Sequence, residues 1–111
     1  MSFAQGDIIK LNFDPTLGHE QAGYRPAVVI SRKMFNQRTG HLTVCPITST
    51  SRTYPTWVAL DGKTATHGYV LCEQVKTIDA DARNPVFIEK IDENVLAKIL
   101  AIVGSIIQKD E

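Results

Sequence analysis

One imidazole, one carboxylate and one guanidinium lie within seven positions of this chain, at His19, Glu20 and Arg25. Glycines flank this segment, and Pro26 and the apolar run 27–30 follow it. Glycine and proline mark turns, and a short apolar run beside them is typical of a buried strand. We therefore expect a loop that leads into a rigid strand, with Arg25 at the junction. Binding and catalytic groups concentrate on loops held by a scaffold, so this loop is the first candidate site.

Each of the three side chains has a chemical role and a structural alternative. The Arg25 guanidinium is always cationic and suits phosphate or carboxylate, and a rigid position would let it stabilise transition-state charge. Alternatively, it pairs with Glu20 and clamps the loop. Glu20 can orient Arg25, act as a general base, or be a solvated surface residue. Histidine is the side-chain type that most readily serves as both acid and base near neutral pH, so His19 can be a catalytic acid or base, or simply an exposed loop histidine.

Two further polar pairs follow predicted strands. Thr48 and Ser49 come just after Pro46, and their hydroxyls can bond a phosphate oxygen or cap the turn. Glu73 and Gln74 end another strand in the same manner. These pairs are the second and third candidate groups of a site.

The aromatic residues Tyr24, Tyr54 and Trp57 can stack on nucleobases, but Trp57 begins a predicted strand, which favours a core position for it. The three histidines lack close metal-ligand spacing with cysteine or carboxylate, so the sequence predicts no metal site. It also has no glycine-rich nucleotide-binding loop, and we expect no cofactor.

Charge and cysteine content bound the class of protein. The 111 residues carry 12 basic and 12 acidic side chains, with an excess of three basic ones over residues 1–76 and three acidic ones over the rest. This distribution permits an anionic ligand near the first loop. Cys45 and Cys72 lie in apolar runs and read as buried free thiols, which favours a reducing cytoplasm. No targeting or membrane-spanning segment is recognisable.

The chain reads as a single domain over 1–111 built from short strands. Alternating or continuous apolar residues, bounded by turn signals, predict strands, with a helical turn over 32–36 and turns at Asp14-Pro15-Thr16 and Asp61-Gly62. The predicted strands are 9–13, 27–30, 41–45 closed by Pro46, 57–60, 69–72, 75–78 and 86–91.

The last segment changes to helical spacing. Asp92 can cap a helix, and apolar residues recur at intervals of three and four from Val95 to Ile107. We expect this stripe to pack on the domain's own sheet, with a partner subunit able to share it, and Gly104 to mark close packing. The fold class is therefore mainly β, a small antiparallel barrel closed by a C-terminal α-helix.

Several segments, in this order, resemble the MazF/PemK/Kid family of toxin endoribonucleases over nearly the whole chain. The segments are Gly6-Asp7-Ile8, Asp14-Pro15-Thr16, Gly18-His19-Glu20-Gln21-Ala22-Gly23-Tyr24-Arg25-Pro26-Ala27-Val28-Val29-Ile30-Ser31, Pro46-Ile47-Thr48-Ser49 and Glu73-Gln74-Val75-Lys76-Thr77-Ile78-Asp79.

The resemblance implies an SH3-like barrel that forms a homodimer, binds single-stranded RNA in a groove across the interface and cleaves it at short sequence motifs without a metal. It implies Arg25 and Thr48 as principal catalytic residues, with Glu20 and, in the PemK/Kid branch, His19. That branch also has an arginine and an acid flanking the late cysteine, whereas this chain has Leu71 and Glu73 there. The expected RNA-binding residues are Gln21, Tyr24, Ser49, Glu73, Gln74 and Lys76.

Metal-free cleavage fits these side chains. The ribose 2′-hydroxyl would attack the neighbouring phosphate and leave 2′,3′-cyclic phosphate and 5′-hydroxyl ends. Arg25 and Thr48 would stabilise the phosphorane charge, while Glu20 or His19 would move protons. DNA would be refused because it lacks the nucleophile.

The sequence leaves two alternative functions open. CcdB-like gyrase poisons share the fold but depend on a Trp-Gly-Ile terminus, whereas this chain ends Gln108-Lys109-Asp110-Glu111. A catalytically inactive SH3-like binding module would not require Arg25, Thr48 and Glu20 together. Under the toxin reading the expected partner is a MazE-like antitoxin whose flexible acidic segment orders on binding.

Overall fold

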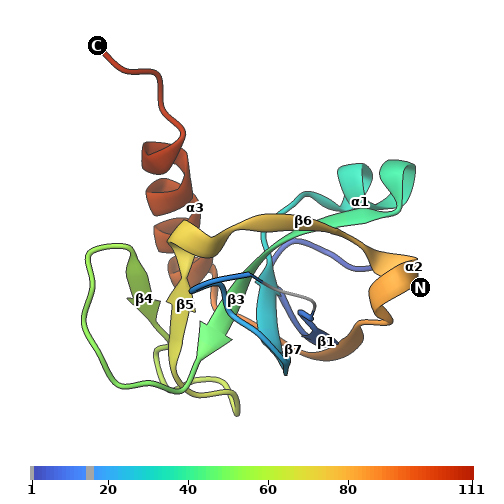
Figure 1. Ribbon diagram of the computed structural model, residues 1–111, viewed down its shortest axis with the longest axis horizontal. Coiled ribbons are helices and arrows are strands. Elements are labelled where there is room, and N and C mark those ends of the chain that lie inside the picture. The colour runs from blue at the N-terminus through green and yellow to red at the C-terminus, as the bar shows by residue number, and fades with distance from the viewer. Residues whose placement is uncertain (1, 15–16) are drawn as a thin grey trace.

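The computed structural model describes residues 2–14 and 17–111, and its strands form one curved antiparallel sheet with the last helix packed beside it (Figure 1). The strands are β1 (Asp7–Asn12), β2 (Tyr24–Val29), β3 (His41–Thr48), β4 (Trp57–Ala59), β5 (Tyr69–Leu71), β6 (Lys76–Asp79) and β7 (Val86–Lys90). The helices are α1 (Lys33–Thr39), the 3-10 turn η1 (Cys72–Gln74), α2 (Ala80–Arg83) and α3 (Glu93–Ile106). Of the predicted turn at Asp14-Pro15-Thr16, Pro15 and Thr16 lie outside the described residues.

The sheet follows the order β4-β5-β3-β2-β1-β7, and β6 pairs separately with β3. Among the described residues no pairing joins β4 to β7, so the expected barrel is an open, curved sheet rather than a closed ring. The predicted class, mainly β with a C-terminal helix, is confirmed.

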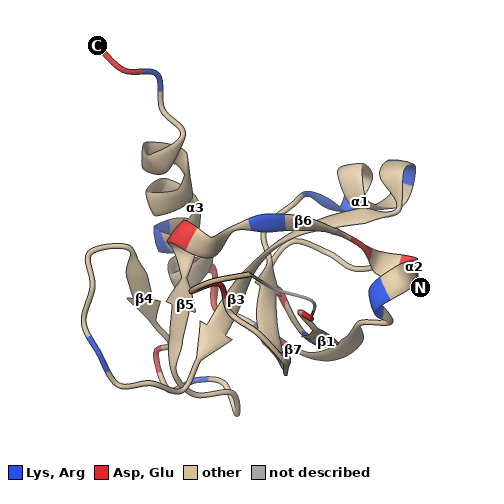
Figure 2. Cartoon of the chain, in the orientation of Figure 1, with Lys and Arg blue, Asp and Glu red and all other residues tan. Residues whose placement is uncertain are grey.

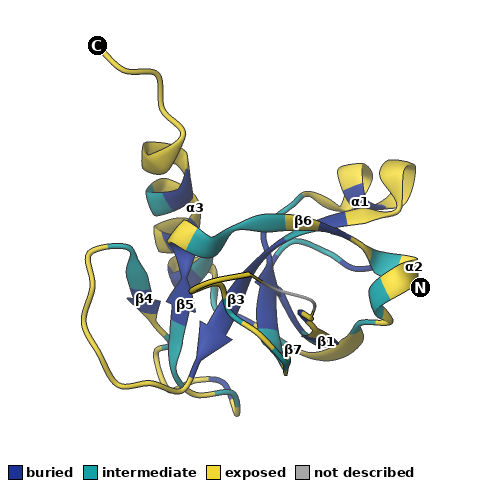
Figure 3. Ribbon diagram, in the orientation of Figure 1, coloured by how far each residue is buried: buried dark blue, intermediate teal, exposed yellow. Residues whose placement is uncertain are grey.

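The sheet is buried on both faces, because neighbouring residues of its central strands belong to two different apolar clusters. Ile8, Val28 and Cys45 pack with the α3 residues Val95, Ile99 and Val103 in one cluster. Their neighbours Ile9, Val29 and Val44 pack in the other, together with Phe3, Leu11, Phe13, Ala27, Leu42 and Ile78. Side chains alternate along a strand, so a strand covered on both sides must be apolar at successive positions. This explains why residues 27–30, directly after Arg25 and Pro26, are continuously apolar and buried. Figure 3 shows the middle of the sheet coloured mostly as buried.

The C-terminal helix forms as predicted, with one correction. The Asp92 carboxylate caps it by accepting a hydrogen bond from the Asn94 backbone N–H at 3.0 Å. A Cβ added at Gly104 would meet no atom of the described residues within 4 Å, so the prediction of close packing at this glycine is wrong. Part of the apolar stripe also stays outside the core: Leu100, Ile106 and Ile107 are exposed.

Pro46 does not end the third strand, contrary to the prediction. β3 continues to Thr48, and Pro46 lies opposite Ala27 of β2. On its other edge β3 pairs with β6 through 41–44 and with β5 through 47–48. Pro46 therefore falls where β3 changes partners, and its missing N–H breaks neither ladder.

Both cysteines are fully buried and free, as expected. Hydrogen bonding with Cys72 and burial raise the pKa of the Cys45 thiol far above its ordinary value. No helix in the described parts of the chain has the length and apolar character needed to span a membrane.

Glu89 ties the loop between β4 and β5 to the sheet. A β-bulge lies at this point, because Ile8 faces Glu89 while the next residue, Ile9, faces Phe87. The Glu89 carboxylate accepts hydrogen bonds from the backbone N–H of Ala65 at 3.0 Å and from the N–H and hydroxyl of Thr66, both at 2.8 Å. The hydrogen bonds from Thr66 lower the pKa of Glu89 below 4.5.

We predict that Glu89→Gln lowers stability at neutral pH and that its effect shrinks on acidification. A lowered folded-state pKa contributes stability that is present above the unfolded pKa and lost as the pH falls through the folded one. Thermal unfolding of wild type and variant between pH 7 and pH 3 measures this difference. Glu111→Gln, at an exposed position, is the matched control. A destabilisation that stays constant across this range would contradict the prediction.

Candidate active site

Arg25 and Thr48 occupy equivalent positions on two paired strands. Ala27 of β2 lies opposite Pro46 of β3, and each candidate residue lies two positions beyond that pair along its own strand. Since side chains alternate with a period of two, both residues lie on the same face of the sheet as Ala27 and Pro46. Thr48 is 5% exposed and Arg25 is half-buried, so both are held by the scaffold.

The Arg25 side chain is held by its own loop. Its Nε donates a hydrogen bond to the Ala22 carbonyl oxygen at 2.8 Å, and its backbone lies opposite Leu11 of β1. None of the ion pairs among the described residues joins Arg25 to Glu20. The alternative prediction, in which these two side chains pair and clamp the loop, is therefore wrong. Among the described residues, no hydrogen bond or ion pair involves the Arg25 Nη atoms.

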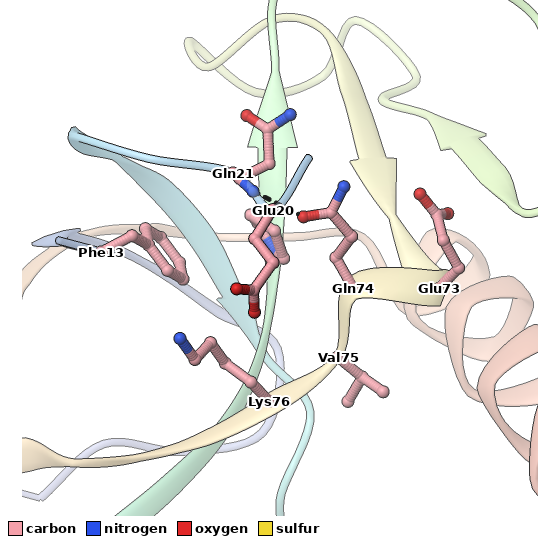
Figure 4. A pocket seen from close by; sticks show the side chains of 8 residues that line it. Phe13, Glu20, Gln21, Glu73, Gln74, Val75 and Lys76 are labelled. Atoms are coloured by element: carbon pink, nitrogen blue, oxygen red, sulfur yellow. Dashed lines mark hydrogen bonds between the residues drawn. The ribbon is translucent and has the colours of Figure 1, made fainter. Parts of the chain in front are cut away.

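Glu20 closes a tight turn in the first loop. Its carboxylate accepts a hydrogen bond from the Leu17 N–H at 2.9 Å, and its own N–H donates to the Leu17 carbonyl oxygen at 3.3 Å. The side chain lines a hollow of about 170 Å³, here called the inner pocket, and Lys76 of β6 lines it too (Figure 4). The complete lining is Phe13, Glu20, Gln21, Pro46, Glu73, Gln74, Val75 and Lys76.

A second and larger hollow of about 600 Å³, here called the groove, contains Thr48 and His19 in its walls. Its lining is His19, Gln21, Thr48, Thr50, Arg52, Tyr54, Thr56, Trp57, Glu73 and Gln74. Gln21, Glu73 and Gln74 border both hollows, and the Gln21 N–H donates to the Gln74 side-chain oxygen at 2.7 Å. The two hollows are therefore neighbours separated by this contact (Figure 4).

The structure thus brings seven of the ten predicted site residues to one region, and three lie apart from its walls. Glu20, Lys76, His19, Thr48, Gln21, Glu73 and Gln74 line the two hollows. Arg25, Tyr24 and Ser49 line neither of them. Tyr24 is exposed, with the Lys10 ammonium 5.0 Å from its ring centre.

Three groove residues escaped the sequence reasoning: Thr50, Arg52 and Thr56. The polar loop at 48–56 was recognisable from its composition, but composition does not reveal which of its side chains turn inward. Trp57 is half-buried and lines the groove, so the interpretation of it as a core residue is wrong. The Glu73 carboxylate fixes this wall by accepting hydrogen bonds from the Thr56 hydroxyl at 2.7 Å and from Trp57 Nε1 at 3.3 Å.

Gly68 sets the backbone position of Thr48. It has a φ of +124°, and a Cβ built on it would lie 2.1 Å from the Thr48 carbonyl oxygen. Only glycine fits such an approach, because any side chain would push the end of β3 away. The Thr48 Oγ1 accepts a hydrogen bond from the Thr50 N–H at 3.2 Å, which orients the hydroxyl at the groove wall.

The charges around the two hollows are mixed. Lys76 and Arg52 supply cations, and Glu20 and Glu73 supply carboxylates (Figure 2). Within the described residues no three His, Cys, Asp or Glu side chains gather in a way that could hold a metal ion. The two hollows thus bring together basic side chains, the Thr48 hydroxyl, the Glu20 carboxylate and the His19 imidazole.

Comparison with known proteins supplies the deciding observation. The sequence profile of a family described as PemK-like, MazF-like toxins of type II toxin–antitoxin systems matches residues 4–107. This chain belongs to that family. Endoribonuclease toxin MazF of Escherichia coli K12 is 49% identical over 78 residues, which cover 70% of this chain and 69% of MazF. Endoribonuclease PemK of Escherichia coli is 36% identical and covers 93% of this chain and 80% of PemK. The predicted class, an endoribonuclease toxin, is confirmed.

Solved structures agree with this assignment. Crystalline MazF from Deinococcus radiodurans superposes with a TM-score of 0.93 at 33% identity, covering 98% of this chain and 99% of that one. A MazE–MazF complex from the same organism matches with a TM-score of 0.85 at 28% identity, covering 99% of both chains. The whole toxin fold is therefore shared, including both strands that carry Arg25 and Thr48.

We predict that Gly68→Ala damages this toxin more than Gly62→Ala does. Both glycines have positive φ, so each substitution carries backbone strain of about 1–3 kcal/mol. Only at Gly68 does the added methyl group meet the Thr48 backbone; at Gly62 no atom lies within 4 Å. Urea denaturation gives the free energies of unfolding, and equal losses in the two variants would contradict this account of Gly68.

Proposed function

We propose that this toxin cleaves single-stranded RNA without a metal ion, with the ribose 2′-hydroxyl as nucleophile. The observation that carries the proposal is the placement of Arg25 and Thr48 on one face of β2 and β3, each two residues beyond the Ala27–Pro46 pair. The names of the relatives, endoribonucleases MazF and PemK, support RNA as the substrate class. We propose further that residues 1–111 act as a single toxin domain.

In this mechanism Arg25 and Thr48 stabilise the charge that develops on phosphorus-bound oxygen. The 2′-oxygen forms a bond to phosphorus while the bond from phosphorus to the 5′-oxygen breaks, so that negative charge accumulates on the equatorial oxygens. A guanidinium and a hydroxyl held in advance by the sheet stabilise that charge without reorganisation. Removing one such donor typically lowers kcat by about 100- to 1000-fold.

Two groups are available for the proton transfers. Glu20 takes the proton from the 2′-hydroxyl, and this role is favoured because the carboxylate forms no ion pair with Arg25 among the described residues. His19 lines the same groove as Thr48 and gives a proton to the leaving 5′-oxygen. The products are a 2′,3′-cyclic phosphate and a 5′-hydroxyl.

The RNA would run along the two hollows and the surface beside them. Lys76 and Arg52 would neutralise phosphates, and Gln21 and Gln74 would contact bases or sugar. Tyr24 and Ser49, which are exposed beside the hollows, would extend the contact surface.

We further propose a homodimer and a MazE-like antitoxin with a flexible acidic segment as partners. Three exposed apolar side chains, Leu100 and Ile106 on α3 and Ile107 just after it, fit a protein contact because soluble chains rarely leave such a stripe uncovered. The MazE–MazF complexes among the similar structures support an antitoxin partner. Two buried free thiols fit a reducing cytoplasm as the compartment.

The direct test is cleavage of single-stranded RNA with EDTA present, comparing wild type, Arg25→Ala and Glu20→Gln, with the new ends identified. We expect wild type to leave cyclic-phosphate and 5′-hydroxyl ends, and each variant to lose at least about 100-fold in kcat.

Each outcome of this assay bears on a separate part of the proposal. Cleavage by Glu20→Gln at the wild-type rate would refute the base role alone. No cleavage by folded, antitoxin-free wild type would refute the ribonuclease and favour a gyrase poison or an inactive binding module.

A further inference from the structure

A row of three aromatic rings borders the groove, and two of them, Tyr54 and Trp57, line it. Tyr54 and Trp57 lie with ring centres 5.1 Å apart and tilted by 55°, and Trp57 continues to Tyr69 at 6.0 Å. Tyr54 is 45% exposed although it belongs to this cluster, so one part of the row faces solvent inside a hollow. Exposed rings in a polar groove are suited to stacking against another flat π-system.

Neighbouring side chains hold the Trp57 ring in place but constrain the Tyr54 ring much less. Trp57 is fixed by its hydrogen bond to Glu73, whereas the described contact of the Tyr54 hydroxyl is a long one of 3.4 Å from Arg52. The Arg52 guanidinium lies 5.8 Å from the Tyr54 ring centre. A long cationic side chain therefore lies beside an exposed aromatic ring. Sites for single-stranded nucleic acid combine these two groups, the cation for a phosphate and the ring for a base.

We propose that the groove contains a stacking subsite for one unpaired nucleobase, formed by Tyr54 and Trp57, with Arg52 on the adjoining phosphate. The inference deepens the proposed function, because Thr48 lines the same groove and the stacked base would belong to a nucleotide near the scissile phosphate. The Glu73 carboxylate in this wall repels phosphate, so the base rather than the backbone turns toward it.

The edge of the base would meet two complementary groups. The Gln74 oxygen accepts from Gln21, and among the described residues its NH₂ group makes no hydrogen bond. That NH₂ is a donor, while Glu73 has acceptor capacity beyond its bonds to Thr56 and Trp57. A donor and an acceptor from adjacent residues can read one base edge while the rings hold its face.

Trp57 is the only tryptophan, so its fluorescence reports directly on this subsite. The probe is a random-sequence single-stranded DNA 20-mer, which offers bases and phosphates but no 2′-hydroxyl. We expect it to quench Trp57, and Tyr54→Ala to weaken its binding about 5- to 150-fold, as loss of one stacked base does. Tyr54→Phe, which keeps the ring, should bind as wild type does. Phe35→Ala is the matched control, because Phe35 is 41% exposed on α1 and does not line the groove.

A second probe separates stacking from charge. An oligonucleotide of abasic sites with the same number of phosphates should bind wild type and Tyr54→Ala equally weakly. Equal binding of base-bearing and abasic probes to wild type would overturn the proposal, as would unquenched Trp57 or an unaffected Tyr54→Ala. If Tyr54→Ala fails to fold by circular dichroism, Tyr54→Leu replaces it, since leucine keeps bulk without the ring. If folded wild type does not cleave RNA but the DNA probe still quenches its Trp57 fluorescence, the proposed function is refuted and the subsite stands.

Discussion

The antiparallel pairing of β2 with β3, in which Ala27 lies opposite Pro46, is the constraint on which the site depends. Both strands are buried on two faces, so their register cannot slip by one residue without moving apolar side chains out of both clusters. The register in turn assigns Arg25 and Thr48 to one face. Residues 23 positions apart in sequence thus come to lie on one face of the sheet because of core packing.

The two hollows lie where β3 changes its pairing partner from β6 to β5. β3 leaves β6 after residue 44 and meets β5 at residue 47, and Pro46 fills the interval without losing a ladder hydrogen bond. The segment that connects β5 to β6 supplies Glu73 and Gln74 to the walls, and Lys76, the first residue of β6, lines the inner pocket. Gly68 then lets the chain approach the Thr48 carbonyl oxygen. The same irregularity therefore opens the hollows and positions the hydroxyl.

Local sequence signals predicted the elements better than they predicted the site. The loop before Arg25, the buried run at 27–30 and the capped helix after Asp92 follow from turn residues and periodicity. The predicted strand end at Pro46 was wrong. Whether proline ends a strand depends on which edge of the strand is paired, and residues distant in sequence decide that pairing. The prediction of close packing at Gly104 was wrong because the sequence does not show whether another segment packs against a helical glycine.

The grouping of the candidate site came from family resemblance rather than from spacing. No local pattern connects Thr48 with His19 or Glu20, since these residues come together only in the folded chain, where the Gln21–Gln74 hydrogen bond joins the first loop to η1 across 53 residues. Arg52 and Thr56 were missed because a Ser- and Thr-rich loop does not reveal its inward face. The competing roles of Glu20 were narrowed only by the structure, in which none of the ion pairs among the described residues joins Glu20 to Arg25.

The central claim is that the β2–β3 pairing directs Arg25 and Thr48 to the same phosphate. A double-mutant cycle tests it most directly, with kcat/KM for RNA cleavage measured for wild type, Arg25→Ala, Thr48→Val and the double variant. If both side chains stabilise one transition-state charge, the double variant should lose much less than the product of the two single losses. Losses that multiply within error would contradict the account, because they would mean that the two residues act independently.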